Sequence, residues 1–442
     1  MSEVSVLKIR SISFCLILAV LLMLSGCNLF SDRSDSLLQC PRPGGELNEI
    51  QEALNESVSS NYTLKYAKSG EYRSAFVIKD FALDGVSQAL VFYSVAKKKE
   101  DVLNMALARE VNKEWVILGS TALGGTDIEK LDFGDLDGDG ILEVIVAWSI
   151  YGAPETRLSV FQLSGDIPVS IFEDSYTDFC VYDMDSNGCD DILLCSINST
   201  SRSAVCNMLS FSEGVPSTVS SVEMDKSMTS IRRFLKTELN GNPAVYIDAY
   251  SGSDTLFTEI ISCHDGKLSA PLYEQSKQSH ILTKRYKDIP CGSIDKDSLP
   301  EIPTMTPMPH SGQPENTLYL TEWKQYSKGK LETKEYSVIS AGLQYKVVID
   351  PSWLGYFTCE AVLKNGGTVF YEYSSESGIG KELFRLAQIN REEYKAKNYE
   401  DWFTLYEDES SVIIGKISES SEKIKLSEKI IKNIFYKNIT EE

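Results

Sequence analysis

The sequence is poor in the residues and motifs that most enzymes use for acid–base or nucleophilic catalysis. It has three histidines, His264, His280 and His310, and lacks a nucleophile elbow, an HExxH motif, a P-loop and a dinucleotide-binding fingerprint. The tract "CHDG" (263–266) places Cys, His and Asp side by side. Neighbouring side chains of a strand point to opposite faces, so these three cannot form a nucleophile–base–orienter relay. We therefore predict a hairpin turn here and no catalytic residues in the chain.

Basic residues are few relative to acidic ones. The 43 lysines and arginines are outnumbered by 64 aspartates and glutamates, which gives a formal net charge of −21. This balance argues against a nucleic-acid partner and against a basic membrane-binding surface. It favours cations as partners.

Cysteines beyond residue 27 are too sparse for a disulfide scaffold, and the absence of any CxxC pair leaves a zinc site unsupported. Cys195 and Cys206 flank the tract "NSTSR" (198–202). If this tract is a hairpin loop, the two cysteines face each other across two strands at a spacing that permits a disulfide. Two buried free thiols are the alternative.

The apolar run near the start, "ISFCLILAVLLML" (12–24), is too short for a comfortable membrane span of about 20 residues. It follows a basic region with Lys8 and Arg10 and precedes small residues, as in a secretory signal peptide. Leu24-Ser25-Gly26-Cys27 resembles the lipobox of bacterial lipoproteins, in which cleavage precedes the cysteine and its thiol and amine are acylated. The resemblance implies a signal peptide over 1–27 and an acylated Cys27 that anchors the chain in the lipid bilayer, on the extracytoplasmic face of a bacterial cell membrane. An ordinary secretory signal is the alternative.

Five loop segments recur along the chain at intervals of roughly 50 residues and indicate a repeat. Aligned on one glycine position, they are "DFALDGVSQALVFY" (80–93), "DLDGDGILEVIVAW" (135–148), "DMDSNGCDDILLCS" (183–196), "KTELNGNPAVYIDA" (236–249) and "SIDKDSLPEIPTMT" (293–306). A polar turn between strand-like runs follows each segment. Each unit thus predicts four short strands, one entering the loop, one leaving it, and a hairpin pair. This is typical of a β-propeller blade, so we predict a mainly β fold, a propeller of about five to seven four-stranded blades.

The repeat does not cover the whole chain. We predict a tether with a short helix over 28–65, the propeller over 66–340, and a small C-terminal α/β module or closing blades over 341–442. The helix of the tether is expected at 48–58, and the apolar spacing of "LSEKIIKNIFYKNI" (426–439) predicts a terminal amphipathic helix.

Three of the loops place oxygen-bearing side chains at relative positions 1, 3, 5 and 9, which suits a hard cation because several oxygens converge on one point. The predicted calcium ligands are Asp135, Asp137, Asp139 and Glu143 in one loop and Asp183, Asp185, Asn187 and Asp191 in the next. A weaker third set is Ser293, Asp295, Asp297 and Glu301, with Ser298 at the glycine position. The remaining loops keep fewer such groups: Asp80, Asp84 and Gln88 in one, and Glu238 and Asn240 in the other.

An EF-hand does not fit these loops. It needs a glutamate at position 12, where this chain has Val146 or Leu194, and a β-rich run follows the loop in place of a helix. A tight turn without an ion is the alternative, because Asp, Asn and Gly favour turns in any case.

The loop at 135 carries a family resemblance. Phe133-Gly134, "DLDGDG" (135–140) and Gly152-Ala153-Pro154 resemble the FG-GAP repeat of integrin-α-type propellers and are similar to bacterial VCBS-type repeats. In that family a loop with acids at positions 1, 3, 5 and 9 binds calcium and leads into a blade strand. The resemblance covers roughly 70–340 through the loops and their period. It implies Ca²⁺ in a structural role and names no ligand.

Together these features predict a membrane-anchored lipoprotein whose calcium-stabilised propeller is a non-enzymatic binding or scaffolding module for an envelope protein or glycan. The alternative is an enzyme acting on surface polysaccharide, a lyase or hydrolase, which needs acid–base residues that converge at the channel mouth. A third option is an assembly factor that docks partners by strand addition.

Overall fold

The computed structural model describes residues 45–58, 61–96, 101–152, 156–212, 214–295, 297, 299–309, 317–362 and 367–440. The predicted signal peptide, its lipidation residue Cys27, and the first part of the predicted tether lie outside these residues. None of the helices within the described ranges is long and apolar enough to span a membrane.

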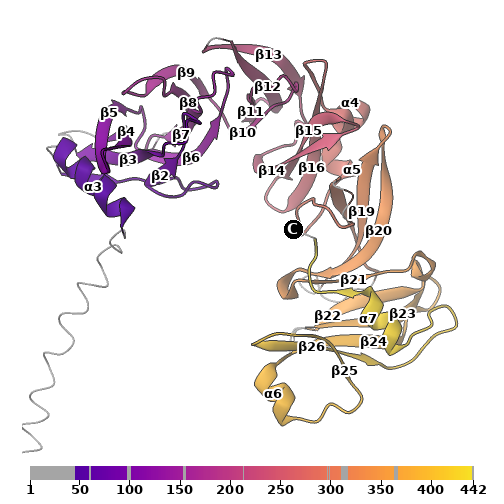
Figure 1. Ribbon diagram of the computed structural model, residues 1–442. Coiled ribbons are helices and arrows are strands. Elements are labelled where there is room, and N and C mark those ends of the chain that lie inside the picture. Colours follow the sequence, from indigo (N-terminus) through magenta and orange to yellow (C-terminus); the bar gives the residue numbers. More distant parts are fainter. Residues whose placement is uncertain are drawn as a thin grey trace, which may run out of the picture.

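The described chain folds into six antiparallel sheets that follow one another in sequence order (Figure 1). The first contains β1 (Tyr62–Leu64), β2 (Phe76–Lys79), β3 (Gln88–Ala96), β4 (Asp101–Val111) and β5 (Glu114–Ala122). The second contains β6 (Asp127–Gly134), β7 (Glu143–Ser149), β8 (Thr156–Gln162) and β9 (Val169–Ser175). The third contains β10 (Asp178–Tyr182), β11 (Asp191–Asn198), β12 (Ser203–Ser212) and β13 (Val215–Glu223). The prediction of a mainly β fold is confirmed.

The second half of the chain continues the series. The fourth sheet contains β14 (Ser230–Leu239), β15 (Asn242–Ser251), β16 (Thr255–His264) and β17 (Lys267–Ser269). The fifth contains β18 (Glu301–Pro307), β19 (Tyr319–Ser327), β20 (Lys330–Ser340), β21 (Tyr345–Val348) and β27 (Phe435–Tyr436). The sixth contains β22 (Phe357–Val362), β23 (Gly367–Ser374), β24 (Gly378–Asn390), β25 (Phe403–Glu407) and β26 (Ser411–Ile417).

Short helices occupy the connections and the two ends of the described chain. They are α3 (Glu46–Ser57), α4 (Pro271–Ser276), α5 (Ser279–Leu282), α6 (Arg391–Ala396) and α7 (Glu428–Ile434), with 3₁₀ turns η2 (Ala341–Leu343) and η3 (Pro351–Trp353). The helices α3 and α7 confirm the two that the sequence predicts. Ser427 caps α7 by accepting a hydrogen bond from the Ile430 amide, which fixes where that helix begins.

The four-strand unit is arranged as the sequence predicts. The loop that follows β6 returns the chain as β7, with Gly134 opposite Glu143, and β8 and β9 complete the sheet. The tract at 263–266 is a hairpin turn between β16 and β17, since Asp265 and Gly266 have positive φ angles of 49° and 68°. Cys263 is buried while the His264 side chain is 75% exposed, so the two lie on opposite faces.

Apolar side chains pack each sheet against its neighbours in the chain. Separate clusters join the first sheet to the second, the second to the third, the third to the fourth, the fourth to the fifth and the fifth to the sixth. Among the described residues, no such cluster joins the sixth sheet to the first. Figure 1 shows these two sheets at opposite ends of an open arc. Closure into a propeller stays a prediction.

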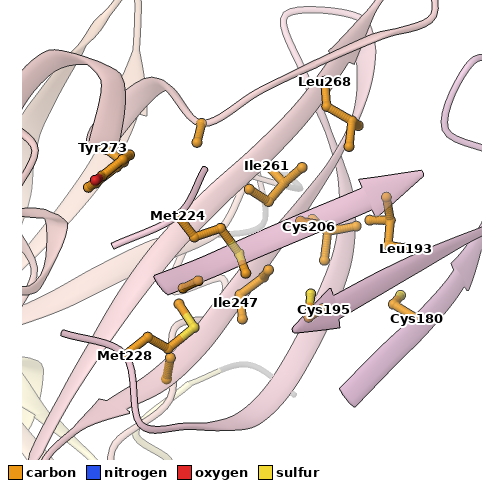
Figure 2. Packing of buried hydrophobic residues seen from close by; sticks show 14 of the residues in the cluster. Cys180, Leu193, Cys195, Cys206, Met224, Met228, Ile247, Ile261, Leu268 and Tyr273 are labelled. Carbon is orange, nitrogen blue, oxygen red and sulfur yellow. The ribbon is translucent and has the colours of Figure 1, made fainter. Parts of the chain in front are cut away.

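The interface between the third and fourth sheets contains the cysteine pair (Figure 2). Cys195 of β11 lies directly opposite Cys206 of β12, as the hairpin prediction requires. Both thiols are buried and free in this structure. A hydrogen bond with the Cys206 side chain, together with burial, raises the pKa of Cys195 well above its usual value. The disulfide between them stays a prediction.

The division of the chain at residue 340 falls inside the fifth sheet. There β20 pairs with β21, and Lys346 of β21 lies opposite Tyr436 of β27, close to the C-terminus. The domain boundaries predicted from the sequence stay a prediction.

Candidate metal centres

The loop between β6 and β7 is bent by its own aspartates. Asp135 accepts hydrogen bonds from the backbone amides of Gly138 at 2.8 Å and Gly140 at 3.1 Å, one on each carboxylate oxygen. Both glycines have positive φ angles, 77° and 82°, a conformation that favours glycine over other residues. Asp139 accepts a third bond from the Ile141 amide at 2.7 Å. These local bonds turn the chain and bring the start of the loop back to the first residue of β7.

Three carboxylates converge inside this loop. Asp135, Asp137 and Glu143 each place an oxygen within 4.8 Å of the others. Glu143 is fully buried; its Oε2 accepts a hydrogen bond from the Leu136 amide at 2.9 Å, and its Oε1 is buried with no hydrogen-bond partner among the described residues. An unpaired buried oxygen of this kind costs about 1–3 kcal/mol. Burial raises the pKa of Glu143 to about 7, and the neighbouring acids add to the effect.

The loop between β10 and β11 repeats the frame. Asp183 accepts hydrogen bonds from the amides of Asn187 at 3.1 Å and Gly188 at 3.0 Å. Asp183, Asp185 and Asp191 each place an oxygen within 4.8 Å of the others. Asp191 accepts bonds from the Met184 amide at 2.9 Å and from the Ser210 hydroxyl, and burial raises its pKa to about 6.

The third cluster lies ahead of β18. Asp295, Asp297 and Glu301 each place an oxygen within 4.8 Å of the others. Glu301 is fully buried, accepts a hydrogen bond from the Ile294 amide at 3.0 Å, and has its pKa raised to about 7 by burial. The hydroxyl of Ser293, at position 1, is buried without a partner among the described residues. Ser298, at the glycine position, lies outside those residues.

The structure thus brings together most of the predicted ligands. The clustered ones are the acids at positions 1, 3 and 9 of the first two loops and at positions 3, 5 and 9 of the third. The position-5 residues Asp139 and Asn187 each use Oδ1 to accept a backbone hydrogen bond, from Ile141 and Cys189 respectively. Their role as ligands, like that of Ser293, stays a prediction.

One polar side chain per cluster is not predicted by the loop spacing. Gln162 donates to Asp137 at 3.3 Å, Ser210 donates to Asp191, and Gln325 donates to Glu301 at 3.1 Å. Each lies on the strand that pairs with the strand leaving the loop. Gln325 is directly opposite Glu301. Gln162 and Ser210 each lie one residue beyond the partner of the residue that follows the position-9 acid. The sequence contains a signal for two of these partners, because Gln162 follows Glu143 at the same spacing as Ser210 follows Asp191.

The loop between β2 and β3 has the same frame with a different charge balance. Asp80 accepts hydrogen bonds from the amides of Asp84 at 3.1 Å and Gly85 at 2.8 Å. Position 9 is Gln88, which lies opposite Arg109 of β4. The Arg109 guanidinium donates to Asp84 at 3.1 Å, so a side chain supplies the positive charge.

The segment at 236–249 contains no such loop. Leu239 pairs directly with Asn242, and the two residues between them, Asn240 and Gly241, have positive φ angles of 54° and 77°. This is a two-residue hairpin turn. Its sequence shares only the aligned glycine, Gly241, with the acidic loops of the other units.

No family model matches the chain, and no curated protein matches it. Among solved structures, the chain is similar to the rhamnogalacturonan lyase YesW at 12% identity, over 72% of this chain and 76% of that one, with a TM-score of 0.30. It is similar to a Bacillus licheniformis rhamnogalacturonan lyase at 13% identity, over 73% and 76%, with a TM-score of 0.30. An exo-beta-1,3-galactanase from Phanerochaete chrysosporium gives 11% identity over 78% and 82%, with a TM-score of 0.29. Likenesses this weak carry no information on the activity of this chain.

Proposed function

We propose that the three acidic clusters bind calcium and that the bound ions stabilise the loops of a β-propeller. The observation that carries the proposal is the Oε1 atom of Glu143, which is buried beside two other carboxylates and has no hydrogen-bond partner among the described residues. A cation supplies what this oxygen lacks. Clusters of carboxylate oxygens without nitrogen or sulfur ligands suit a hard ion, and the flexible coordination of calcium suits loops of three carboxylates plus water or backbone oxygens.

The ions have a structural role in this proposal. Asp135, Asp137 and Glu143 would hold the first ion, and the second and third clusters would each hold another. Each ion links the start of a loop to the strand that leaves it, because positions 1 or 3 and position 9 belong to those two parts. Glu143 and Glu301, the position-9 ligands, are fully buried.

The propeller is supported by the repeated four-stranded sheet and by the apolar clusters between successive sheets. Five of the six sheets lie mainly within 66–340, where the propeller is predicted, and the sixth lies within 341–442, the predicted C-terminal module or closing blades. Small-angle X-ray scattering tests closure: a closed ring gives a radius of gyration near the roughly 22 Å of a compact chain of this size. A clearly larger value would support an open arc.

We further propose that Cys27 anchors the protein as an extracytoplasmic lipoprotein, and that the propeller binds or scaffolds an envelope protein or glycan without catalysis. The support is the lipobox-like segment 24–27 and the absence of a catalytic motif in the sequence. In cells fed labelled palmitate, the wild-type chain should carry label and sediment with membranes, and Cys27→Ser should lose both properties.

The metal proposal is tested by titrating the purified protein with calcium in a calorimeter, with Glu143→Gln as the comparison. On addition of calcium, the wild type should release or absorb heat and should melt at a higher temperature than without calcium. The variant should bind one calcium ion fewer. If purified surface polysaccharide is shortened by the wild-type protein, the non-enzymatic part of the proposal fails and the polysaccharide enzyme takes its place.

A further inference from the structure

A cavity of about 780 Å³ lies in the sixth sheet, far along the chain from the acidic clusters. It lies beside the end of β24, where the pairing of β24 with β26 continues beyond its described pairing with β23. On one side β24 pairs with β26 as far as Asn390, opposite Ser411; on the other side it pairs with β23 only as far as Ala387, opposite Gly367. The helix α6 and the segment after it, as far as Trp402, form the wall beside the end of β24, which no described residue of β23 pairs with. Figure 1 shows α6 next to β25 at the end of the arc.

Two aromatic side chains line this wall and are held in place from behind. The rings of Tyr399 and Trp402 meet edge to face, with centroids 6.5 Å apart and an interplanar angle of 90°. Tyr394 stacks on Tyr399 at 5.4 Å and 22°, and the Tyr394 hydroxyl is hydrogen-bonded to Thr404 at 3.0 Å. The Trp402 amide donates to the Tyr399 carbonyl at 2.9 Å. The aromatic surface is therefore formed before any ligand arrives, which lowers the entropic cost of binding.

The rest of the lining mixes apolar and polar groups. The apolar members include Val369, Leu386 and Ile389, and the polar ones include Gln388, Asn390 and Ser410. The side-chain Oε1 of Gln388 is buried and has no hydrogen-bond partner among the described residues. That oxygen is out of reach of a ligand in the cavity, so the hydroxyls of a ligand would pair with the exposed atoms of the polar lining residues.

The charged groups of the lining are already neutralised. Lys397 donates to Glu393 at 2.6 Å, and Arg385 donates to Glu382 at 2.8 Å. An anionic ligand would have to displace one of these carboxylates from its cation. The cavity therefore favours an uncharged ligand, in a molecule whose formal net charge of −21 already repels anions.

We propose that this cavity binds a neutral saccharide chain, with a pyranose face packed on Trp402, its edge against Tyr399, and its hydroxyls paired with Gln388 and Asn390. Its volume lies within the range of about 300–1,000 Å³ that is usual for small-molecule sites, which fits a short oligosaccharide. The inference rests on the binding role proposed above and deepens it by naming a site and a ligand class. It does not depend on calcium in the loops.

The test is a calorimetric titration of the purified full-length protein with defined hexasaccharides: cellohexaose, maltohexaose and β-1,4-galactohexaose as neutral probes, and hexagalacturonate as the acidic probe. At least one neutral probe should bind at one site per chain, and the acidic probe should not bind. Trp402→Ala should weaken binding at least tenfold, Gln388→Leu several-fold, and Trp402→Phe less than Trp402→Ala. The matched control is Tyr356→Ala, an exposed aromatic near the same sheet that does not line the cavity, and it should bind as the wild type does.

Absence of binding by all three neutral probes, preference for hexagalacturonate, or unchanged affinity in Trp402→Ala would each overturn the proposal. A melting curve of each variant shows whether it is folded, and Gln388→Leu tests the site if Trp402→Ala is not. Repeating the titration in chelator separates this inference from the calcium proposal. Saccharide binding without calcium binding overturns only the metal claim, and calcium binding without saccharide binding overturns only the cavity claim.

Discussion

The loop between β2 and β3 and the loop between β6 and β7 share a backbone frame but differ in how their charge is balanced. In both, the aspartate at position 1 accepts two backbone amides of its own loop. In the first, Arg109 reaches across from β4 and donates to Asp84. In the second, Gln162 reaches Asp137 as a neutral donor, and the buried Glu143 Oε1 has no partner among the described residues.

This difference separates the turn from the ion site. The turn depends on position 1 and on glycine at position 6, which both loops have. The proposed ion site depends on acids at positions 3 and 9, where the first loop has Ala82 and Gln88. We expect the first loop to be independent of calcium because Arg109 already pairs with Asp84, whereas three converging carboxylates leave the second one short of a positive charge.

Removal of calcium should have the largest effect. At a free calcium concentration of about 100 times the Kd, each site stabilises the folded state by about 2.7 kcal/mol. Excess chelator should therefore lower the melting temperature by several degrees, and restored calcium should return it. Magnesium at the same concentration is the control and should restore less. An identical melting temperature in chelator and in calcium would contradict a stabilising role for the ion.

Glu143→Gln should change stability in opposite directions with and without calcium. In chelator, the substitution removes a buried carboxylate whose pKa is raised to about 7, so the variant should melt above the wild type at pH 8. In calcium, the loss of one ligand should cost up to about 2.7 kcal/mol, so the variant should melt below it. Thermal melts in both buffers check this crossover. A variant less stable than the wild type in both buffers would point to a packing role.

In chelator, the melting temperature should fall as pH rises from 5 to 8. The carboxyl pKa values of Glu143, Asp191 and Glu301 are raised from 4.5 or 3.8 to about 7, 6 and 7. The folded state then binds protons more tightly than the unfolded state, so stability is full below the unfolded pKa and is lost as pH rises through the folded pKa.

Glu259, buried with its pKa raised to about 8, contributes with the same sign. The contribution of the first cluster is therefore measured with Glu143→Gln, whose melting temperature in chelator should fall less steeply with pH than that of the wild type. Saturating calcium should flatten or reverse the slope, because the ligands must lose their protons to bind it. A slope in chelator that rises toward pH 8 would count against the raised pKa values.

Arg109→Gln should have the smallest effect. The Arg109 and Asp84 side chains are 38% and 43% exposed, and exposed pairs of this kind contribute about 0–1 kcal/mol. The variant should melt within a few degrees of the wild type and bind the same number of calcium ions. Gain of a calcium ion by this variant would show that the Arg109 side chain alone keeps calcium out of the first loop. Acids at positions 3 and 9 would then matter less than proposed.

Much of this contrast can be predicted from the sequence, because it depends on local spacing. Alternating acids and glycines predict the loops, and turns such as the one at Asp265 and Gly266 predict the hairpins. The partners Arg109 and Gln162 cannot be found this way because they lie on another strand, and strand register decides which loop they reach. The alignment at Gly241 is misleading for a related reason: the same glycine conformation serves a two-residue hairpin.

The sixth sheet is the least predictable part. Its strands are not consecutive in the sheet, since β24 pairs with β26 and β25 lies at the edge. The cavity lies where β24 extends past its last described pair with β23, and the aromatic wall comes from a short helix and turn beyond it. No local pattern records such an offset between strands.

Calcium binding by the acidic loops is tested most directly by counting the ions bound to one chain, by native mass spectrometry supported by calorimetry at pH 7.5. We predict up to three ions for the wild type, with one fewer in Glu143→Gln and no change in Arg109→Gln. A wild-type chain that binds no calcium at millimolar concentration, with an unchanged melting temperature, would contradict this and leave the acidic loops as turns without an ion.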